Sequence, residues 1–390
     1  MPLDSKEYRI AALAAGDSAT ELFSLSGKSR LEAIFARLKL PVIDSAEEAS
    51  GYDDILIAHS GYVFDERVIG DFLTTRRSAL AAPAERGGDA VVAAICRSAE
   101  ARRWADLVAA ETGVNAIPSG EGVTIYSASE ISGTYNQRLR KREVPLVLKA
   151  SPERKSLIER RLFKGSYKGA TDIVTKFVLP KPAFHATRAA ASLGIHPNLI
   201  TTASLVFVVA TFYLFARGEF AAGLLSGWLM CFLDTVDGKL ARVTLKSSKW
   251  GNLYDHGIDL IHPPFWYWAF AIGLVATGNL SGLSASDVWT CLWVIVGGYV
   301  FGRLIEGYFV RRFKIEIHIW RPVDYWFRHV TSRRNPNLLI LTIATAAGAP
   351  ALGFAVVAAW TVVSVGFHAA RLVAAETTAP SRPLKSWLAE

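Results

Sequence analysis

The residues Asp234-Thr-Val-Asp237-Gly238-Lys-Leu-Ala241-Arg242 and, after eight more, Gly251-Asn-Leu-Tyr-Asp255-His-Gly-Ile-Asp259 place four aspartates beside strongly apolar sequence. Carboxylates at membrane depth are costly and need a compensating partner. The first pair is spaced by three residues and the second by four, so each pair lies on one face of a helix. Two such faces turned toward each other form a carboxylate cluster that requires bound cations. Because hard oxygen ligands suit Mg²⁺, Mn²⁺ or Ca²⁺, the stretch predicts a divalent-metal site.

The small and basic residues of the same stretch predict that a phosphate binds there. Gly238 and Gly251 leave room for a phosphate or a ligand backbone to approach closely. Arg242 offers a guanidinium fork of the kind that binds phosphate. The alternative is that the aspartates cap helices or form ion pairs at the ends of membrane spans. That alternative does not account for the two glycines and the fixed offsets.

The full pattern, D-x-x-D-G-x-x-A-R, eight residues, then G-x-x-x-D-x-x-x-D, resembles the signature of the CDP-alcohol phosphotransferase (CDP-alcohol phosphatidyltransferase) family. The matching positions are Asp234, Asp237, Gly238, Ala241, Arg242, Gly251, Asp255 and Asp259. The resemblance implies a membrane enzyme, usually a homodimer, that transfers a phospho-alcohol group from a CDP-linked donor to an acceptor hydroxyl and releases CMP.

The resemblance also implies roles for individual residues. Two divalent ions, Mg²⁺ or Mn²⁺, are expected to bridge the four aspartates, and Asp259 is expected to act as the general base. The cytidine and phosphates are assigned to Gly238, Ala241, Arg242 and Gly251, and Ser248 stands where the family often has a small hydroxyl residue. The run His196-Pro197-Asn198-Leu-Ile-Thr201 resembles the Pro-Asn-x-x-Thr stretch that lines the nucleotide pocket, which assigns Asn198 and Thr201 to that pocket.

Composition indicates an integral membrane protein with a soluble part. The chain has 390 residues, a net charge of +8 and 11 tryptophans, and its mean hydropathy is +0.25. Its Lys and Arg residues cluster beside apolar segments, which favours lipid headgroups and phosphorylated substrates over nucleic acid. The spacing of the three cysteines fits neither a zinc site nor a disulfide framework. The N-terminus lacks a signal-peptide pattern, so we expect it to stay in the cytoplasm.

Residues 1–148 are predicted to form a cytoplasmic α/β domain with a largely parallel sheet. Apolar runs at 8–15, 54–59 and 90–95 indicate buried strands, and they alternate with helical patterns at 31–40 and 99–112. The residues 11–16, 25–32 and 61–67 resemble the start of sugar-phosphate nucleotidyltransferases. The glycine-rich loop with its arginine, which would cradle a nucleotide triphosphate, is missing after Gly16. We therefore expect a degenerate domain kept for docking or regulation, with a working nucleotidyltransferase as the alternative.

The remaining chain is predicted to be an all-α membrane bundle. Residues 149–198 form a basic linker with an amphipathic helix over 181–193, residues 199–376 the phosphotransferase domain, and residues 377–390 a cytoplasmic tail. About six spans are expected, at residues 200–216, 221–233, 260–277, 288–309, 338–349 and 352–373. The second is expected to continue through the first half of the motif, and the third to begin with the second half.

The charges between the spans predict the orientation. The loops over residues 239–249 and 311–334 are basic, whereas those over 277–287 and 348–353 contain no Lys or Arg. The positive-inside rule then places the basic loops, both termini and the aspartates on the cytoplasmic side of the plasma (inner) membrane. An even number of spans satisfies this arrangement.

The acceptor site is expected near the inner end of the fourth span. Arg303 and Arg321 are candidates for gripping a phosphorylated acceptor, with positive-inside anchoring as the alternative. The layout resembles proteins that join a nucleotidyltransferase-like domain to the phosphotransferase, as in inositol-phosphate cytidylyltransferase/di-myo-inositol-phosphate-phosphate synthases. This implies CDP-inositol or another soluble donor. The alternatives are CDP-diacylglycerol with a small polyol or its phosphate as acceptor, a cation-binding transporter, or a soluble nucleotidyltransferase with an incidental anchor.

Overall fold

The computed structural model describes residues 8–18, 20–84, 87–117, 122–378 and 384–389. It divides into two units. Unit 1 comprises Met1–Asn136, Arg142–Ser166 and Val243–Leu245, and unit 2 comprises Gln137–Lys141, Tyr167–Arg242 and Lys246–Glu390. The N-terminus, expected to be cytoplasmic, and part of the predicted tail fall on residues 1–7, 379–383 and 390, which lie outside the described residues. The predicted domain boundary at residue 148 stays a prediction.

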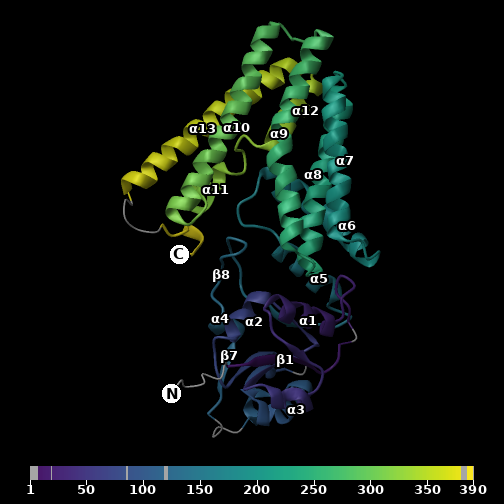
Figure 1. The fold of residues 1–390 in the computed structure, drawn as a ribbon, viewed down its shortest axis with the longest axis vertical. Coiled ribbons are helices and arrows are strands. Elements are labelled where there is room, and N and C mark those ends of the chain that lie inside the picture. Colours follow the sequence, from purple (N-terminus) through teal and green to yellow (C-terminus); the bar gives the residue numbers. More distant parts are fainter. Residues whose placement is uncertain (1–7, 19, 85–86, 118–121, 379–383, 390) are drawn as a thin grey trace, which may run out of the picture. The chain divides into compact units, whose positions relative to one another are not determined.

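Unit 1 is built around a six-stranded sheet with the strand order β2-β1-β3-β6-β5-β7. Figure 1 labels β1 and β7 of this sheet. The strands of this sheet are β1 (Ile10–Ala15), β2 (Val42–Ile43), β3 (Asp54–His59), β5 (Ser78–Pro83), β6 (Asp89–Arg97) and β7 (Thr124–Ser127). The short strands outside it are β4 (Tyr62–Phe64), β8 (Tyr135–Asn136), β9 (Lys141–Arg142) and β10 (Val147–Lys149). The α-helices are α1 (Gly27–Arg37), α2 (Glu66–Phe72), α3 (Ala101–Ala109), α4 (Ala128–Ile131) and α5 (Lys155–Gly165). Short 3-10 turns occupy Ala46–Gly51, Ser98–Glu100 and Val114–Ala116.

The prediction of an α/β domain is confirmed, and the sheet is mixed. β1 runs parallel to β2 and β3, and β5 runs parallel to β7, but β6 is antiparallel to both of its neighbours, β3 and β5. Only five residues separate β5 from β6, which is too short for the crossover that a parallel pair requires. The central strands are buried on both faces, one packed with α1 and α2 and the other with α3.

Unit 2 is helical. Its α-helices are α6 (Pro180–Ser192), α7 (Pro197–Ala216), α8 (Phe220–Val243), α9 (Lys249–Thr277), α10 (Ala285–Phe313), α11 (Pro322–Phe327), α12 (Arg334–Ala346) and α13 (Pro350–Thr378). A π-helical turn spans Val174–Val178, and 3-10 turns span Ile317–Ile319 and Trp387–Ala389. Helix α7 packs against α9, and α10 packs against α13 (Figure 1). The predicted helix over 181–193 corresponds to α6.

Four described helices are long and apolar enough to cross a membrane: α7, α8, α10 and α13. Helix α9 has 29 residues, but its first turns carry the aspartates, and Pro263 and Pro264 lie inside it. Helix α12 has 13 residues, fewer than the roughly 20 that a full span needs. The predicted number of six spans therefore stays a prediction. The expected continuity of α8 and α9 through the two halves of the motif is confirmed.

Candidate active site

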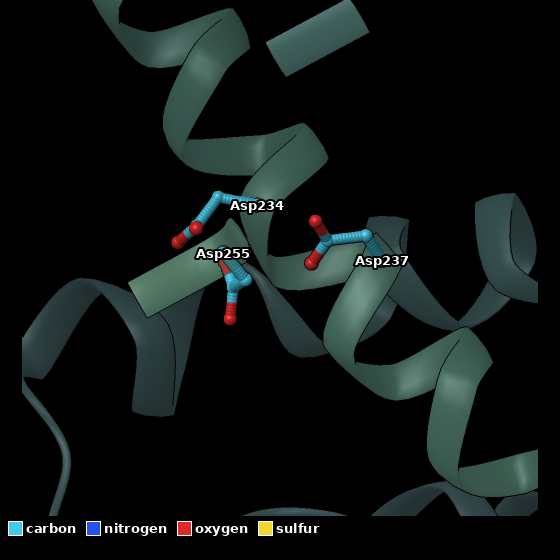
Figure 2. Close-up of side chains that lie close together, drawn as sticks. All are labelled: Asp234, Asp237 and Asp255. Atoms are coloured by element: carbon cyan, nitrogen blue, oxygen red, sulfur yellow. The ribbon is translucent and has the colours of Figure 1, made fainter. Parts of the chain in front are cut away.

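The aspartates of the motif come together from two consecutive helices. Asp234 and Asp237 lie on α8, and Asp255 lies on α9. One carboxylate oxygen of each lies within 4.8 Å of one from each of the others, and Figure 2 shows the three side chains as one group. The i,i+3 spacing places the α8 pair on one face, and the short connection between the helices brings the first turns of α9 beside it. The helical spacing thus produces the predicted carboxylate cluster for three of the four residues.

The fourth aspartate, Asp259, is linked to Asp234 through the side chain of Arg334 on α12. The Arg334 guanidinium donates from Nη2 to Asp234 Oδ2 over 2.6 Å and from Nη1 to Asp259 Oδ1. The Asp259 side chain is 41% exposed, compared with 16% for Asp234. Asp259 is thus the member of this linked pair that an incoming molecule reaches more easily.

Helix α7 supplies the predicted nucleotide-pocket residues. Its first position is Pro197, whose fixed φ suits the first turn of a helix, and His196 is the N-cap. The Thr201 hydroxyl donates to Asp237 Oδ2 over 2.5 Å. A Cβ at Gly251 would lie 2.9 Å from Asn198 Oδ1. The start of α7 therefore contacts both halves of the motif.

The other predicted phosphate-binding residues surround the connection between α8 and α9. Ser248 caps α9 and accepts a hydrogen bond at Oγ from the Gly251 N–H over 2.9 Å. The carbonyl of Ala241 accepts a hydrogen bond from Ser247 Oγ over 3.1 Å. A Cβ at Gly238 would lie 3.5 Å from both terminal nitrogens of Arg242, which shows that this guanidinium lies back along the helix over the glycine.

The donor set fits a divalent cation. Asp237 is 3% exposed, and its Oδ1 has no hydrogen-bond partner among the described residues, although Oδ2 is bound by Thr201. A buried carboxylate oxygen without a partner costs free energy that a bound cation would recover. The three grouped aspartates offer carboxylate oxygens, the ligands that Mg²⁺ and Mn²⁺ prefer.

A cavity that opens to solvent, with about 500 Å³ of empty space when the open part is included, adjoins the linked aspartates at Arg334. Helices α9, α10, α12 and α13 all contribute to its wall. Along α10 the lining changes from Ile295 and Gly298 to Arg303 and Glu306. The wall also carries a connected set of polar groups, in which Ser332 Oγ lies 2.8 Å from Thr361 Oγ1 and donates to Asn337 Oδ1 over 3.1 Å. This mixture of charged and hydroxyl groups suits a small polar molecule.

The two predicted acceptor residues lie in different places. Arg303 lines the cavity, and its Nη1 donates to Glu306 Oε2 over 3.3 Å. Arg321 is not among the lining residues; it is the N-cap of α11, and its guanidinium lies 5.6 Å from the centre of the Trp320 ring. Both acceptor roles stay predictions, and only the position of Arg303 suits such a role.

A second ion-pair network fixes one side of this cavity. Glu306 also accepts a hydrogen bond from Arg333 Nη2, and its Oε1 lies 3.2 Å from His318 Nε2. Burial lowers the pKa of His318 to about 3, so this imidazole is neutral at physiological pH. Arg333 therefore forms an ion pair with a residue of α10, whereas the next residue, Arg334, forms ion pairs with residues of α8 and α9.

Sequence reasoning missed Arg334 as a site residue. A signal was available: Arg334 is the first residue of α12, where the helix dipole is positive and a cation is unfavourable. A basic residue at that position, in a helix whose apolar run begins at Leu338, needs anionic partners from elsewhere in the fold. The partners themselves, Asp234 and Asp259, lie 100 and 75 residues away, so only the folded chain identifies them.

Comparison with known proteins finds several that are similar to part of this chain. The sequence is 33% identical over 94 residues to an archaetidylinositol phosphate synthase from Pyrococcus horikoshii, which covers 24% of this chain and 50% of that protein. It is 30% identical over 128 residues to a phosphatidylinositol phosphate synthase from Streptomyces avermitilis, covering 32% and 49%. It is 32% identical over 129 residues to cholinephosphotransferase 1 of Danio rerio, covering 31% and 30%. The chain spans about half the length of the two synthases.

A solved structure is also similar, the Mycobacterium tuberculosis phosphatidylinositol phosphate synthase with CDP-DAG bound. Its sequence identity is 16%, the match covers 48% of this chain and 91% of that chain, and the TM-score is 0.36. The family pattern described as CDP-alcohol phosphatidyltransferase matches residues 194–368, which include the whole aspartate motif, α7 and the cavity-lining part of α10. Residues 194–368 of this chain thus form a domain of the CDP-alcohol phosphatidyltransferase family.

Proposed function

We propose that this protein is an integral-membrane transferase that moves a phospho-alcohol group from a CDP-linked donor to an acceptor hydroxyl and releases CMP. The observation that supports the proposal best is the grouping of Asp234, Asp237 and Asp255 across α8 and α9, with a buried Asp237 oxygen left unpaired. The donor diphosphate is densely anionic, so a bare carboxylate cluster would repel it. Divalent cations between the two remove that repulsion.

Each residue of the motif has a proposed part. Asp234, Asp237, Asp255 and Asp259 would hold two divalent ions, Mg²⁺ or Mn²⁺, which when bound neutralise the diphosphate and favour CMP as the leaving group. The cytidine and its phosphates are assigned to the residues around the start of α7 and the connection between α8 and α9. These residues are Asn198, Thr201, Gly238, Ala241, Arg242, Ser248 and Gly251.

Asp259 is proposed as the general base. It accepts the proton of the acceptor hydroxyl, and the acceptor oxygen attacks the phosphorus that carries the alcohol. A new oxygen–phosphorus bond forms while the bond from that phosphorus to the CMP oxygen breaks, and CMP leaves with the electron pair. The exposure of Asp259 and its link through Arg334 to the cavity wall support this part.

The cavity supports a polar acceptor. Arg303 can bind an anionic substituent such as a phosphate, and the hydroxyl and amide groups of the wall suit a polyol. Two donors fit the proposal: a soluble one such as CDP-inositol, and CDP-diacylglycerol with a small polyol or its phosphate as acceptor. Two of the similar proteins are named as inositol phosphate lipid synthases, which favours products of inositol-phosphate or phospholipid headgroup synthesis.

The proposed transferase function also implies a cellular location and an oligomeric state. We propose that the protein is a homodimer in the plasma (inner) membrane with both termini in the cytoplasm, where soluble CDP compounds are available. Residues 1–148 would then form a cytoplasmic domain without nucleotidyltransferase activity, because the nucleotide loop is missing after Gly16. A protease-accessibility experiment on oriented membrane vesicles tests the orientation.

The decisive experiment follows CMP release by the purified full chain with Mg²⁺. The donors are CDP-inositol and CDP-diacylglycerol, each with and without inositol phosphate or a lipid acceptor. We expect acceptor-dependent CMP release with one donor, and its loss in excess EDTA with recovery on added Mg²⁺. If no CDP donor is consumed while proteoliposomes conduct divalent cations, the transporter alternative replaces this proposal. If EDTA leaves CMP release unchanged, the metal assignment is wrong.

A further inference from the structure

Arg334 lies outside the aspartate motif but forms ion pairs with both of its halves. Its planar guanidinium spans two helices, with Nη2 bound to Asp234 on α8 at 2.6 Å and Nη1 bound to Asp259 on α9. A single fork thus links one aspartate from each half of the motif. Arg334 also lines the cavity, so the same side chain lies between the carboxylates and the proposed acceptor space.

The location is unfavourable for a cation unless the carboxylates compensate. The Arg334 side chain is 16% exposed and belongs to the first residue of α12, at the positive end of the helix dipole. Conversely, the aspartates repel one another when no cation is near. Asp234 and Asp259 therefore stabilise Arg334, and Arg334 in turn relieves the repulsion between the two halves of the motif.

We infer that Arg334 is a positioning residue that acts as an internal counter-cation of Asp234 and Asp259 and competes with divalent cations for them. The inference rests on the proposed function only in treating these carboxylates as metal-binding. Its charge repels a divalent ion bound to the same carboxylates, and its Nη2 proton occupies a lone pair of Asp234 Oδ2. The stability of the folded protein should therefore depend more on Arg334 when no ions are bound than when ions are bound.

The same contacts orient Asp259. Arg334 binds Oδ1, while no described residue is recorded as donating to Oδ2. One oxygen of Asp259 is thus held and the other remains for the acceptor proton. Loss of Arg334 should consequently lower kcat more than it raises KM for the CDP donor, and a lysine at this position should restore part of kcat, because an ammonium keeps the charge but not the two-pronged geometry.

The chain offers a matched control in Arg333. It is the preceding residue, it also forms an ion pair, and its partner is Glu306 rather than an aspartate of the motif. The experiment measures the thermal unfolding midpoint of the purified full chain in detergent, without substrate, in EDTA and in Mg²⁺, for wild type, Arg334→Gln, Arg334→Lys and Arg333→Gln. Mn²⁺ serves as a second cation.

We expect Arg334→Gln to melt at lower temperature than wild type in EDTA and to regain most of that loss in Mg²⁺. Its Mg²⁺-dependent shift should be about twofold larger than that of wild type or more, because a ligand that binds the folded state stabilises it according to its affinity. Arg334→Lys should show an intermediate shift. Arg333→Gln should melt lower by the same amount in EDTA and in Mg²⁺.

The inference is overturned if Arg334→Gln loses the same stability with and without Mg²⁺, since Arg334 would then only anchor α12. An Arg334→Gln variant as stable as wild type in EDTA overturns it as well. If Arg334→Gln does not fold, Arg334→Lys decides in the same way. The measurement needs no turnover, so a protein that shows these shifts but consumes no CDP donor refutes the proposed function alone. If the enzyme is active but the Mg²⁺-dependent shift of the unfolding midpoint is the same for wild type and Arg334→Gln, only the role of Arg334 is refuted.

Discussion

Thr201 on α7 donates a hydrogen bond from its hydroxyl to Oδ2 of Asp237 on α8, over 2.5 Å, and this bond is buried. The other carboxylate oxygen of Asp237, Oδ1, has no hydrogen-bond partner among the described residues. Thr201 thereby fixes the orientation of Asp237 and leaves Oδ1 for a cation.

Substitution of Thr201 by valine should destabilise the metal-free protein by about 1–3 kcal/mol, because both oxygens of a buried carboxylate then lack a donor. Added Mg²⁺ should recover part of the loss. Thermal unfolding in EDTA and in Mg²⁺ measures both effects. Thr202→Val is the control, since Thr202 is exposed and, within the described part of the chain, its hydroxyl bonds to Asn198 O and Tyr254 rather than to an aspartate. Equal stability of the two variants would contradict this reading.

Substitution of Gly251 by alanine should lower kcat/KM for the CDP donor by roughly tenfold or more, about 1.4 kcal/mol in transition-state binding. The added Cβ would lie 2.9 Å from Asn198 Oδ1 and 3.1 Å from Ser248 Oγ, so both proposed nucleotide-binding side chains must move. Gly257→Ala, on the same helix, meets no atom within 4 Å and should retain activity. If both variants are equally active, Gly251 is not needed for close approach.

Asp259→Asn should reduce CMP release by about 10²–10⁴-fold, because an amide cannot accept the acceptor proton. Binding of the CDP donor should change much less, since Asp234, Asp237 and Asp255 remain grouped. Steady-state CMP release and equilibrium binding of the donor separate the two effects. A variant that turns over at the wild-type rate would show that another group takes the proton.

Arg303→Gln should raise KM for a phosphorylated acceptor by about tenfold, with little change in KM for the donor, because it removes a charged hydrogen bond in the cavity. Arg311→Gln provides the comparison: Arg311 lies two turns further along α10 and is exposed. The acceptor concentration series is run with inositol phosphate and with unphosphorylated inositol. An unchanged KM for both acceptors would remove Arg303 from the acceptor site.

Local sequence was sufficient for several features of both units. The strand pattern at residues 54–59 matches β3, because a short apolar run between turn residues has few other ways to be buried. The aspartate offsets placed Asp234, Asp237 and Asp255 correctly, since an α-helix fixes which residues share a face. Ser248 is the N-cap of α9 and Pro197 is the first residue of α7, and both positions follow from local backbone preferences.

Other features depend on contacts between distant residues. The short connection makes β6 antiparallel to β5, but only the pairing of β6 with the distant β3 places it inside the sheet. The separation of Arg303 from Arg321 follows from the path of the chain after α10. The sequence alone determined which aspartates share a helix face, because helical periodicity is a local property of the backbone. Only the tertiary structure decided that Arg334 binds Asp234 and Asp259, because a charge selects its partners by proximity in space and by the desolvation that packing imposes.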